Sequence, residues 1–317
     1  MLDGIRDIVN PVLAKAEQLT RPFIEPFLPP PIEPIVPAPA RLPEPPAQAG
    51  WADGVSGQRS QSIDVDMMRM ADAAYDPSRT QVGNWNRVSD ADLRAAGLNP
   101  ADFEDSSTGF RAGLYTDGNG HYTLAFAGSN GGNDWVKTNI PQGLGMQTEQ
   151  YDQAVALAQQ VADSPFGNQG NLVLTGHSLG GGLAGIASLV TDTPAVTFDA
   201  SGVHDDTIRQ FGLDPAAAKA DAEAGLIRRY NVDGDPLTAA QQDAPGLSSI
   251  MPDAPGHEIT LADPLPPLEA PKWDWRHPIE SGKAQIEHQK DKLERVGDLH
   301  RQSTMIQALE TQRPWED

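Results

Sequence analysis

The stretch that decides the fold is an apolar run leading into a glycine-rich turn, Leu172-Val173-Leu174-Thr175-Gly176-His177-Ser178-Leu179-Gly180-Gly181-Gly182-Leu183-Ala184. The run before Gly176 predicts a buried strand, and the small and apolar residues after Gly180 predict a helix. Ser178 stands at the turn with a glycine two residues away on either side, where a Cβ would collide with neighbouring chain. Such a turn exposes a serine hydroxyl and aims a helix N-terminus at developing negative charge. The stretch predicts a nucleophilic Ser178, with the Leu179 N–H as one oxyanion donor.

Segments on both sides of this turn alternate between strand and helix patterns. A β-hairpin is predicted where two apolar runs flank the turn at 117–120. Strands are predicted at 171–175, 194–198 and 226–232, and helices at 63–75, 148–163, 181–190 and 280–310. This alternation predicts an α/β fold of the α/β-hydrolase type, with a central, largely parallel sheet flanked by helices.

The N-terminal part of the chain has a different composition. Apolar residues at helical spacing predict a short amphipathic helix over 1–20, and two aspartates replace the basic start of a signal peptide. Eleven of the 28 prolines fall within 21–49, which predicts an extended proline-rich linker. The remaining residues, 50–317, are predicted to form the catalytic domain, including a C-terminal helical segment.

Charge and composition exclude several classes of protein. The 317 residues carry a formal net charge of −21, and an acidic surface repels nucleic acid. With no cysteine, disulfides and thiolate chemistry are excluded. No window is apolar enough for a membrane span, so no integral membrane insertion is expected. Residues 51–271 hold 29 acids and 11 bases, so apolar insertion or a basic partner is favoured over electrostatic adsorption to anionic lipid.

The glycine-rich turn resembles the nucleophile elbow of the class 3 (fungal-type) lipases. Upstream, the run 124–129 followed by Asp134-Trp135 is similar to that family's oxyanion strand. The stretches 138–145 and 196–202 are most similar to bacterial phospholipase A1-like toxins delivered by type VI or type IV secretion. Ala127 replaces the usual arginine, whereas Ser129 keeps a hydroxyl where threonine is usual. The resemblance therefore implies Ser129 as the second oxyanion donor.

A nucleophilic serine needs a histidine base and an acid that orients it, in the chain order Ser, acid, His. Asp235 follows the predicted strand 226–232 and resembles the acid of this family. The stretch starting at His300 resembles the family's catalytic histidine segment, although the residues immediately after the histidine differ. His257 and His277 remain alternatives, in that order of preference.

The sequence thus predicts a serine ester hydrolase acting on lipids, with Ser178, Asp235 and His300 as the triad and no metal or organic cofactor. The resemblance implies a phospholipase A1-type antibacterial effector, made in the cytoplasm and secreted without a signal peptide into a target cell's envelope. Its implied partners are a lipid or phospholipid substrate, a cognate immunity protein and a secretion-system component. The alternative is a catalytically impaired lipase-fold protein that acts by binding.

Overall fold

A computed structural model of the protein describes residues 50–128, 143–242 and 252–316, although not the side chains of 143–148 and 240. These residues belong to one compact unit, Ala47–Asp317. The predicted helix over 1–20, the proline-rich linker over 21–49 and the predicted oxyanion donor Ser129 lie outside the described residues.

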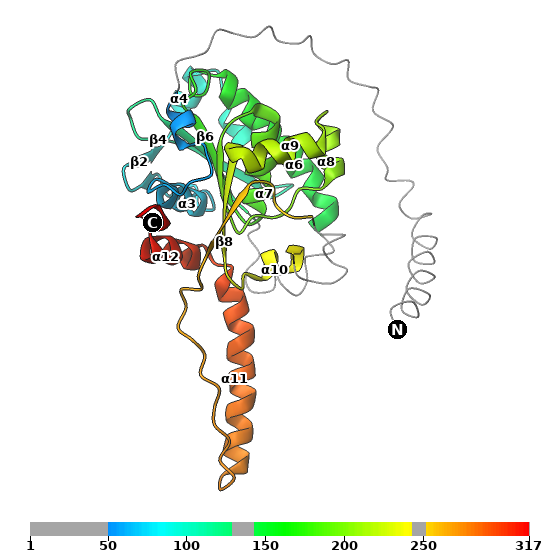
Figure 1. The fold of residues 1–317 in the computed structure, drawn as a ribbon. Helices are drawn as coiled ribbons and strands as arrows, with labels where there is room; N and C mark the ends of the chain where they lie inside the picture. The colour runs from blue at the N-terminus through cyan, green and yellow to red at the C-terminus, as the bar shows by residue number, and fades with distance from the viewer. Residues whose placement is uncertain (1–49, 129–142, 243–251, 317) are drawn as a thin grey trace, which may run out of the picture. The chain divides into compact units, whose positions relative to one another are not determined.

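The centre of this unit is a mixed β-sheet (Figure 1). Its order is β1-β2-β4-β5-β6-β7-β8-β9, with β3 paired to β4. The pairs among β1 to β5 are antiparallel, and β5 to β9 run parallel. The strands are β1 (Gln81–Val82), β2 (Trp85–Arg87), β3 (Glu104–Asp105), β4 (Phe110–Thr116), β5 (Tyr122–Phe126), β6 (Leu172–His177), β7 (Ala195–Phe198), β8 (Ile227–Val232) and β9 (His257–Leu261).

Helices flank this sheet (Figure 1). They are α2 (Trp51–Val55), α3 (Asp64–Ala73), α4 (Asp90–Ala95), α6 (Gly143–Asp163), α7 (Leu179–Thr191), α8 (Asp205–Gln210), α9 (Pro215–Asp221), α10 (Pro236–Gln242), α11 (Pro278–Leu299) and α12 (Gln302–Gln312). Short turns of other helix types are η2 (Pro100–Phe103), η3 (Ala222–Leu226) and η4 (Pro314–Glu316). The predicted α/β class, with a mostly parallel central sheet flanked by helices, is confirmed.

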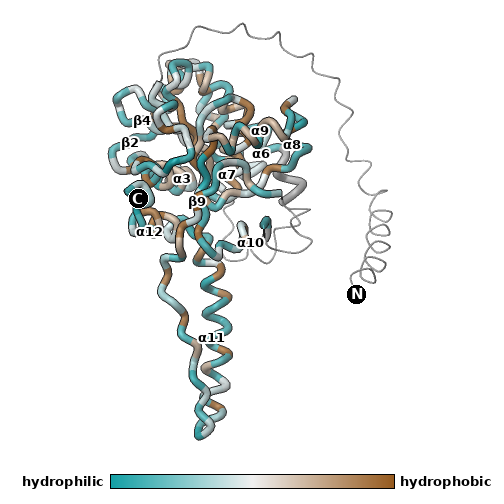
Figure 2. The backbone as a smooth tube through the Cα atoms, viewed as in Figure 1, coloured by the Kyte–Doolittle hydropathy of each residue, from teal (hydrophilic) through white to brown (hydrophobic). Residues whose placement is uncertain are grey.

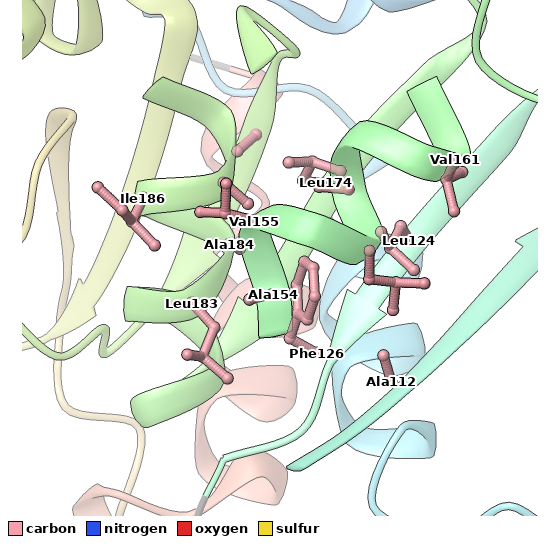
Figure 3. Close-up of a cluster of buried hydrophobic side chains, with 14 of the residues drawn as sticks. Ala112, Leu124, Phe126, Ala154, Val155, Val161, Leu174, Leu183, Ala184 and Ile186 are labelled. Carbon is pink, nitrogen blue, oxygen red and sulfur yellow. The ribbon is translucent and has the colours of Figure 1, made fainter. Parts of the chain in front are cut away.

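Two apolar cores lie on opposite faces of the sheet because successive strand side chains alternate in direction. Leu172 and Leu174 of β6 belong to the core shared with α6 and α7, shown in Figure 3. Val173, between them, belongs to the core shared with α3 and α12. A continuous apolar run is thus explained by burial on both faces, which is typical of a central parallel strand.

A buried ion pair ties α3 to the sheet. Arg228 of β8 donates two hydrogen bonds to the carboxylate of Asp64, of 3.0 and 2.6 Å, and both side chains are almost completely buried. Tyr230 donates its hydroxyl to the same carboxylate. Arg228 also donates to the Val55 and Gly57 carbonyls, so all of its charge is compensated within the fold.

The C-terminal region departs from the prediction of one helix over 280–310. The structure has two helices, α11 and α12, because Arg301 takes an extended backbone conformation between them. The charged neighbours of His288 in the sequence predict a solvated helix face, but its side chain is buried. Residues 264–277 fold back along α11, and Gln285 and Arg295 on the same side donate to carbonyls of that segment.

Candidate active site

Ser178 lies on the sharp turn between β6 and α7. Its φ of 59° and ψ of −127° are a strained conformation for a residue with a side chain. The flanking glycines permit this turn: a Cβ on Gly176 would lie 2.1 Å from the Gly180 carbonyl oxygen, and a Cβ on Gly180 2.2 Å from that of Phe126. The steric reason inferred from the sequence is therefore visible in the structure.

His300 connects Ser178 to Asp235. Its Nε2 lies 2.8 Å from the Ser178 hydroxyl, and its Nδ1 lies 2.6 Å from a carboxylate oxygen of Asp235. His300 directly follows the last residue of α11, so the break between α11 and α12 is where the imidazole reaches the site. Asp235 follows β8 and is buried, and its other oxygen accepts the N–H of Thr238. With the proton on Nδ1, Nε2 can accept a proton from the serine hydroxyl.

The two alternative histidines lie elsewhere. His257 begins β9, and its Nδ1 lies 2.7 Å from a carboxylate oxygen of Glu223. His277 precedes α11, is mostly exposed, and lies 2.9 Å from Asp274. Each of these imidazoles is therefore paired with a local carboxylate, whereas His300 is bonded to both Ser178 and Asp235.

Of the two predicted oxyanion donors, Leu179 lies within the described residues. Leu179 is the first residue of α7, where a backbone N–H has no partner inside its own helix. Gly128, the residue before Ser129, packs closely against Tyr75 and the elbow: a Cβ there would lie 2.4 Å from the Tyr75 hydroxyl. Burial raises the pKa of Tyr75 to about 12, although hydrogen bonds with the Gly128 backbone and the Gln302 side chain lower it. Tyr75 thus links Gly128 to Gln302, the first residue of α12.

Two further polar residues lie beside Ser178, His300 and Asp235. Asp199 directly follows β7 and is fully buried, with Oδ1 accepting the Val232 N–H at 2.9 Å. Its Oδ2 lies 3.9 Å from Nε2 of buried His177, whose ring centroid is 5.0 Å from that of His300. Burial, and then the negative charge of Asp235, raise the pKa of Asp199 well above its ordinary value. Burial, and then His300, lower the pKa of His177 well below its ordinary value.

No function was predicted from the sequence for Asp199 and His177. The available signal was an aspartate at the carboxyl end of a buried strand, the same edge of the sheet as Ser178 and Asp235. Within the described residues, one ligand atom each of His177, Asp199 and His300 lies within 4.8 Å of the others, a spacing that could hold a metal ion. Both ring nitrogens of His300 already face Ser178 and Asp235, so a metal on His300 would compete with those contacts.

The mostly parallel sheet, with a serine on the sharp turn after a central strand, has the architecture of the α/β-hydrolase class. The profile of the Phospholipase-like family, described as a Tle-like phospholipase domain, matches residues 66–264. The chain is also 42% identical over 271 residues to the extracellular phospholipase A1 of Serratia liquefaciens, covering 84% of this chain and 77% of that relative. The chain therefore belongs to the Tle-like phospholipase family and is a lipid ester hydrolase. Within the described part of the chain, no helix has both the length and the apolar character needed to span a bilayer.

Proposed function

We propose that the protein is a phospholipase A1-type enzyme that cleaves an acyl ester of glycerophospholipids with Ser178, His300 and Asp235 as its triad. The observation that carries this proposal is the position of His300, which lies at hydrogen-bond distance from both the serine hydroxyl and the buried carboxylate. The name of the Serratia relative supports the substrate and the position of cleavage.

Each group in this triad has one task. Ser178 Oγ attacks the ester carbonyl carbon while its proton passes to Nε2 of His300. The resulting imidazolium is stabilised and oriented by Asp235. Collapse of the tetrahedral intermediate breaks the ester bond, and His300 returns its proton to the leaving alkoxide of the lysophospholipid. A water molecule then attacks the acyl-serine while His300 accepts its proton. Collapse of this second intermediate releases the fatty acid and regenerates Ser178.

The oxyanion of both tetrahedral intermediates is bound by the Leu179 N–H and by Ser129 in this proposal. The Leu179 N–H adds the favourable end of the α7 dipole, which is oriented before the charge develops. Ser129 is assigned through its resemblance to the second donor of class 3 lipases. The close packing of Gly128, the residue before it, against Tyr75 supports this assignment.

The proposed biological setting is that of a secreted antibacterial effector. Resemblance to secreted phospholipase toxins supports synthesis in the cytoplasm and delivery to the envelope of a target cell. The Serratia relative is an extracellular phospholipase A1, which supports action outside the producing cell. The expected partners are a cognate immunity protein and a component of the secretion system.

The test is mass spectrometry of the products formed from defined phospholipids. Wild type is expected to release fatty acid from one acyl position, whereas Ser178→Ala and His300→Ala lose turnover by at least about a thousandfold. His257→Ala and His277→Ala serve as matched controls and retain turnover. Product release by Ser178→Ala at the wild-type rate would refute the triad, and failure of a fluorophosphonate to label Ser178 would favour the binding-protein alternative.

A further inference from the structure

Residues 262–299, here called the arm, leave β9 and return to the active site at His300. Figure 1 shows α11 and residues 262–277 side by side, leading away from the sheet. Among the described residues, the exposed large hydrophobic side chains all lie on this arm: Leu268, Trp273, Trp275, Ile279, Ile286, Leu293 and Val296. A gathering of apolar side chains of this kind is typical of an interaction surface.

One face of α11 is packed within the arm. Ser281, His288 and Leu299 are buried, and their spacing places them on a common side of the helix. On that side Gln285 donates to the Pro271 carbonyl at 2.8 Å, and Arg295 donates to the Pro266 carbonyl at 2.5 Å. The covered side of α11 is therefore the side that faces residues 262–277.

The opposite side of α11 carries an apolar stripe. Ile279, Ile286 and Leu293 follow one another at intervals of seven residues and are 69%, 62% and 65% exposed. Residues seven apart on a helix differ by only about 20° around its axis. Lys283 and Lys290 border this stripe, and Figure 2 shows its apolar positions set among hydrophilic ones along α11. An apolar stripe bordered by lysines is typical of helices that lie in a membrane interface.

The far end of the arm has the same chemistry. Trp275 is 83% exposed, and its ring centroid lies 5.5 Å from that of Trp273 in an edge-on arrangement. Residues 272–283 contain three basic and two acidic residues, a net charge of +1 in a chain whose net charge is −21. Exposed tryptophans beside cationic side chains suit the headgroup region, where an apolar ring and a polar N–H are both satisfied.

We propose that this face of the arm, the apolar stripe with Trp273 and Trp275, docks on the surface of a phospholipid bilayer. This inference rests on the proposed function, because the bilayer surface is where the substrate lies. The apolar side chains enter the interface, and the bordering lysines contact lipid phosphates. Apolar insertion supplies most of the affinity, since the acidic remainder of the domain is not attracted to anionic lipid.

The stripe leads to the catalytic residue. His300 directly follows Leu299, the last residue of α11, so the helix that carries Ile279, Ile286 and Leu293 ends next to this imidazole. The 22 residues of α11 span about 33 Å. An arm standing upright would hold the active site that far from the lipid, whereas an arm lying along the surface brings His300 to it. The arm therefore lies flat on the bilayer.

A helical partner fits this face less well. A coiled-coil seam needs apolar residues at two positions of each heptad. The second row on α11 consists of Gly282, Gln289 and Val296, of which only the last is a large apolar residue. A helix packed on α11 would also leave Trp273 and Trp275 outside its seam, because they precede the helix.

Binding is tested on the full chain with vesicles of phosphatidylcholine in which both chains are ether-linked, so that binding is separated from hydrolysis. Wild type is expected to sediment with these vesicles. Trp275→Ala lowers the partition coefficient about tenfold, and the triple variant Ile279→Ser, Ile286→Ser, Leu293→Ser lowers it by at least about a hundredfold. The matched control Glu287→Ser, Asp291→Ser alters exposed positions on another side of the same helix and binds as wild type does.

The depth of insertion has its own signal. Vesicles with brominated acyl chains quench the fluorescence of an inserted indole, and Trp275→Phe is expected to retain binding while losing part of that quenching. Binding by the triple variant at the wild-type level, or failure of wild type to bind these vesicles, would overturn the proposal. A dimer seen by analytical ultracentrifugation, abolished by the triple variant in the absence of vesicle binding, would instead assign the face to a second copy.

Turnover separates this proposal from the proposed catalytic function. The triple variant is expected to lose at least about tenfold in hydrolysis of ester-linked vesicles, while its turnover of a soluble nitrophenyl ester stays within twofold of wild type. If the triple variant loses vesicle binding but wild type hydrolyses no ester, the proposed catalytic function is refuted and the docking surface is retained. Equal losses on the soluble and vesicular substrates would make the stripe a structural element and overturn its role in docking.

Discussion

Replacing Asp235 by asparagine is expected to lower kcat/KM on a soluble ester by about four orders of magnitude. The carboxylate is buried and lies 2.6 Å from Nδ1 of His300, so its charge acts on the imidazole with little screening by solvent. An amide at this position presents an N–H or an uncharged oxygen, which favours the wrong tautomer and leaves the imidazolium uncompensated. A comparable loss in serine proteases is about 10⁴, or about 5.5 kcal/mol of transition-state stabilisation.

The same substitution at Asp199 is expected to change kcat/KM less than about threefold. Burial and the charge of Asp235 raise the pKa of Asp199 well above its ordinary value, which favours the protonated carboxyl group. An asparagine resembles a protonated carboxyl group in shape, and its oxygen can still accept the Val232 N–H. Asp199 and Asp235 are both buried at the ends of neighbouring strands, yet only the change to asparagine at Asp235 is expected to lower kcat/KM strongly.

Stability gives a second, independent readout for Asp199. The folded state keeps the proton on Asp199 at pH values above about 3.9, where the unfolded chain has lost it. The free energy of unfolding contributed by this group is therefore fully present below that pH and falls as pH rises toward the raised pKa. Asparagine does not titrate, so the stability of Asp199→Asn relative to wild type is expected to increase with pH from about 4 upward.

The assay is kcat/KM on a nitrophenyl ester at pH 7, with urea denaturation from pH 4 to 7 for wild type, Asp199→Asn and Asp235→Asn. A loss at Asp199→Asn as large as that at Asp235→Asn would show that Asp199 acts as an ionised acid and would refute the reasoning. Retention of more than a tenth of wild-type turnover by Asp235→Asn would remove Asp235 from the triad.

Three further perturbations test the fold around the site. Gly180→Ala places a Cβ 2.2 Å from the Phe126 carbonyl oxygen, so urea denaturation is expected to show a loss of about 1–3 kcal/mol, and unchanged stability would contradict the observed turn. Asp64→Ala leaves the buried guanidinium of Arg228 unpaired and is expected to cost about 3–5 kcal/mol in the same assay, more than the double change Asp64→Leu, Arg228→Met. Deleting residues 1–46 is expected to leave soluble-ester turnover within twofold, because Ala47–Asp317 is a compact unit; a tenfold loss would show that the deleted part is needed for catalysis.

The sequence was sufficient for the nucleophile turn because that turn depends on local sterics. Gly176 and Gly180 are required by contacts within a few residues or with the adjacent strand, and these constraints are readable from residue size alone. The hairpin of β4 and β5 was predictable for the same reason, since glycines and Asp117 mark its turn. Strand β9 carries a weaker pattern, and its parallel pairing with β8 is a long-range contact that periodicity does not report.

The proposed acid and base were harder to predict because they depend on which distant segments meet. Residues with the chemistry of a base occur at several late positions, and only the tertiary arrangement distinguishes His300 from His257 and His277. The expected chain order Ser, acid, His limited the candidate bases to histidines after Asp235 but did not choose among them. Asp199 shows the opposite difficulty: its strand was predicted, yet its protonation depends on burial beside Asp235, which the sequence does not display.

The break between α11 and α12 shows how the chain combines these requirements. Residues 280–310 contain no proline, so local propensity favours one continuous helix. In the structure His300 is bonded to Asp235 and Ser178, while α12 packs on the core that contains α3. A straight helix could not satisfy both positions, so the backbone turns at Arg301. Because the same break ends the arm, the proposed docking of α11 on lipid would fix the position of the bilayer relative to His300, the proposed general base.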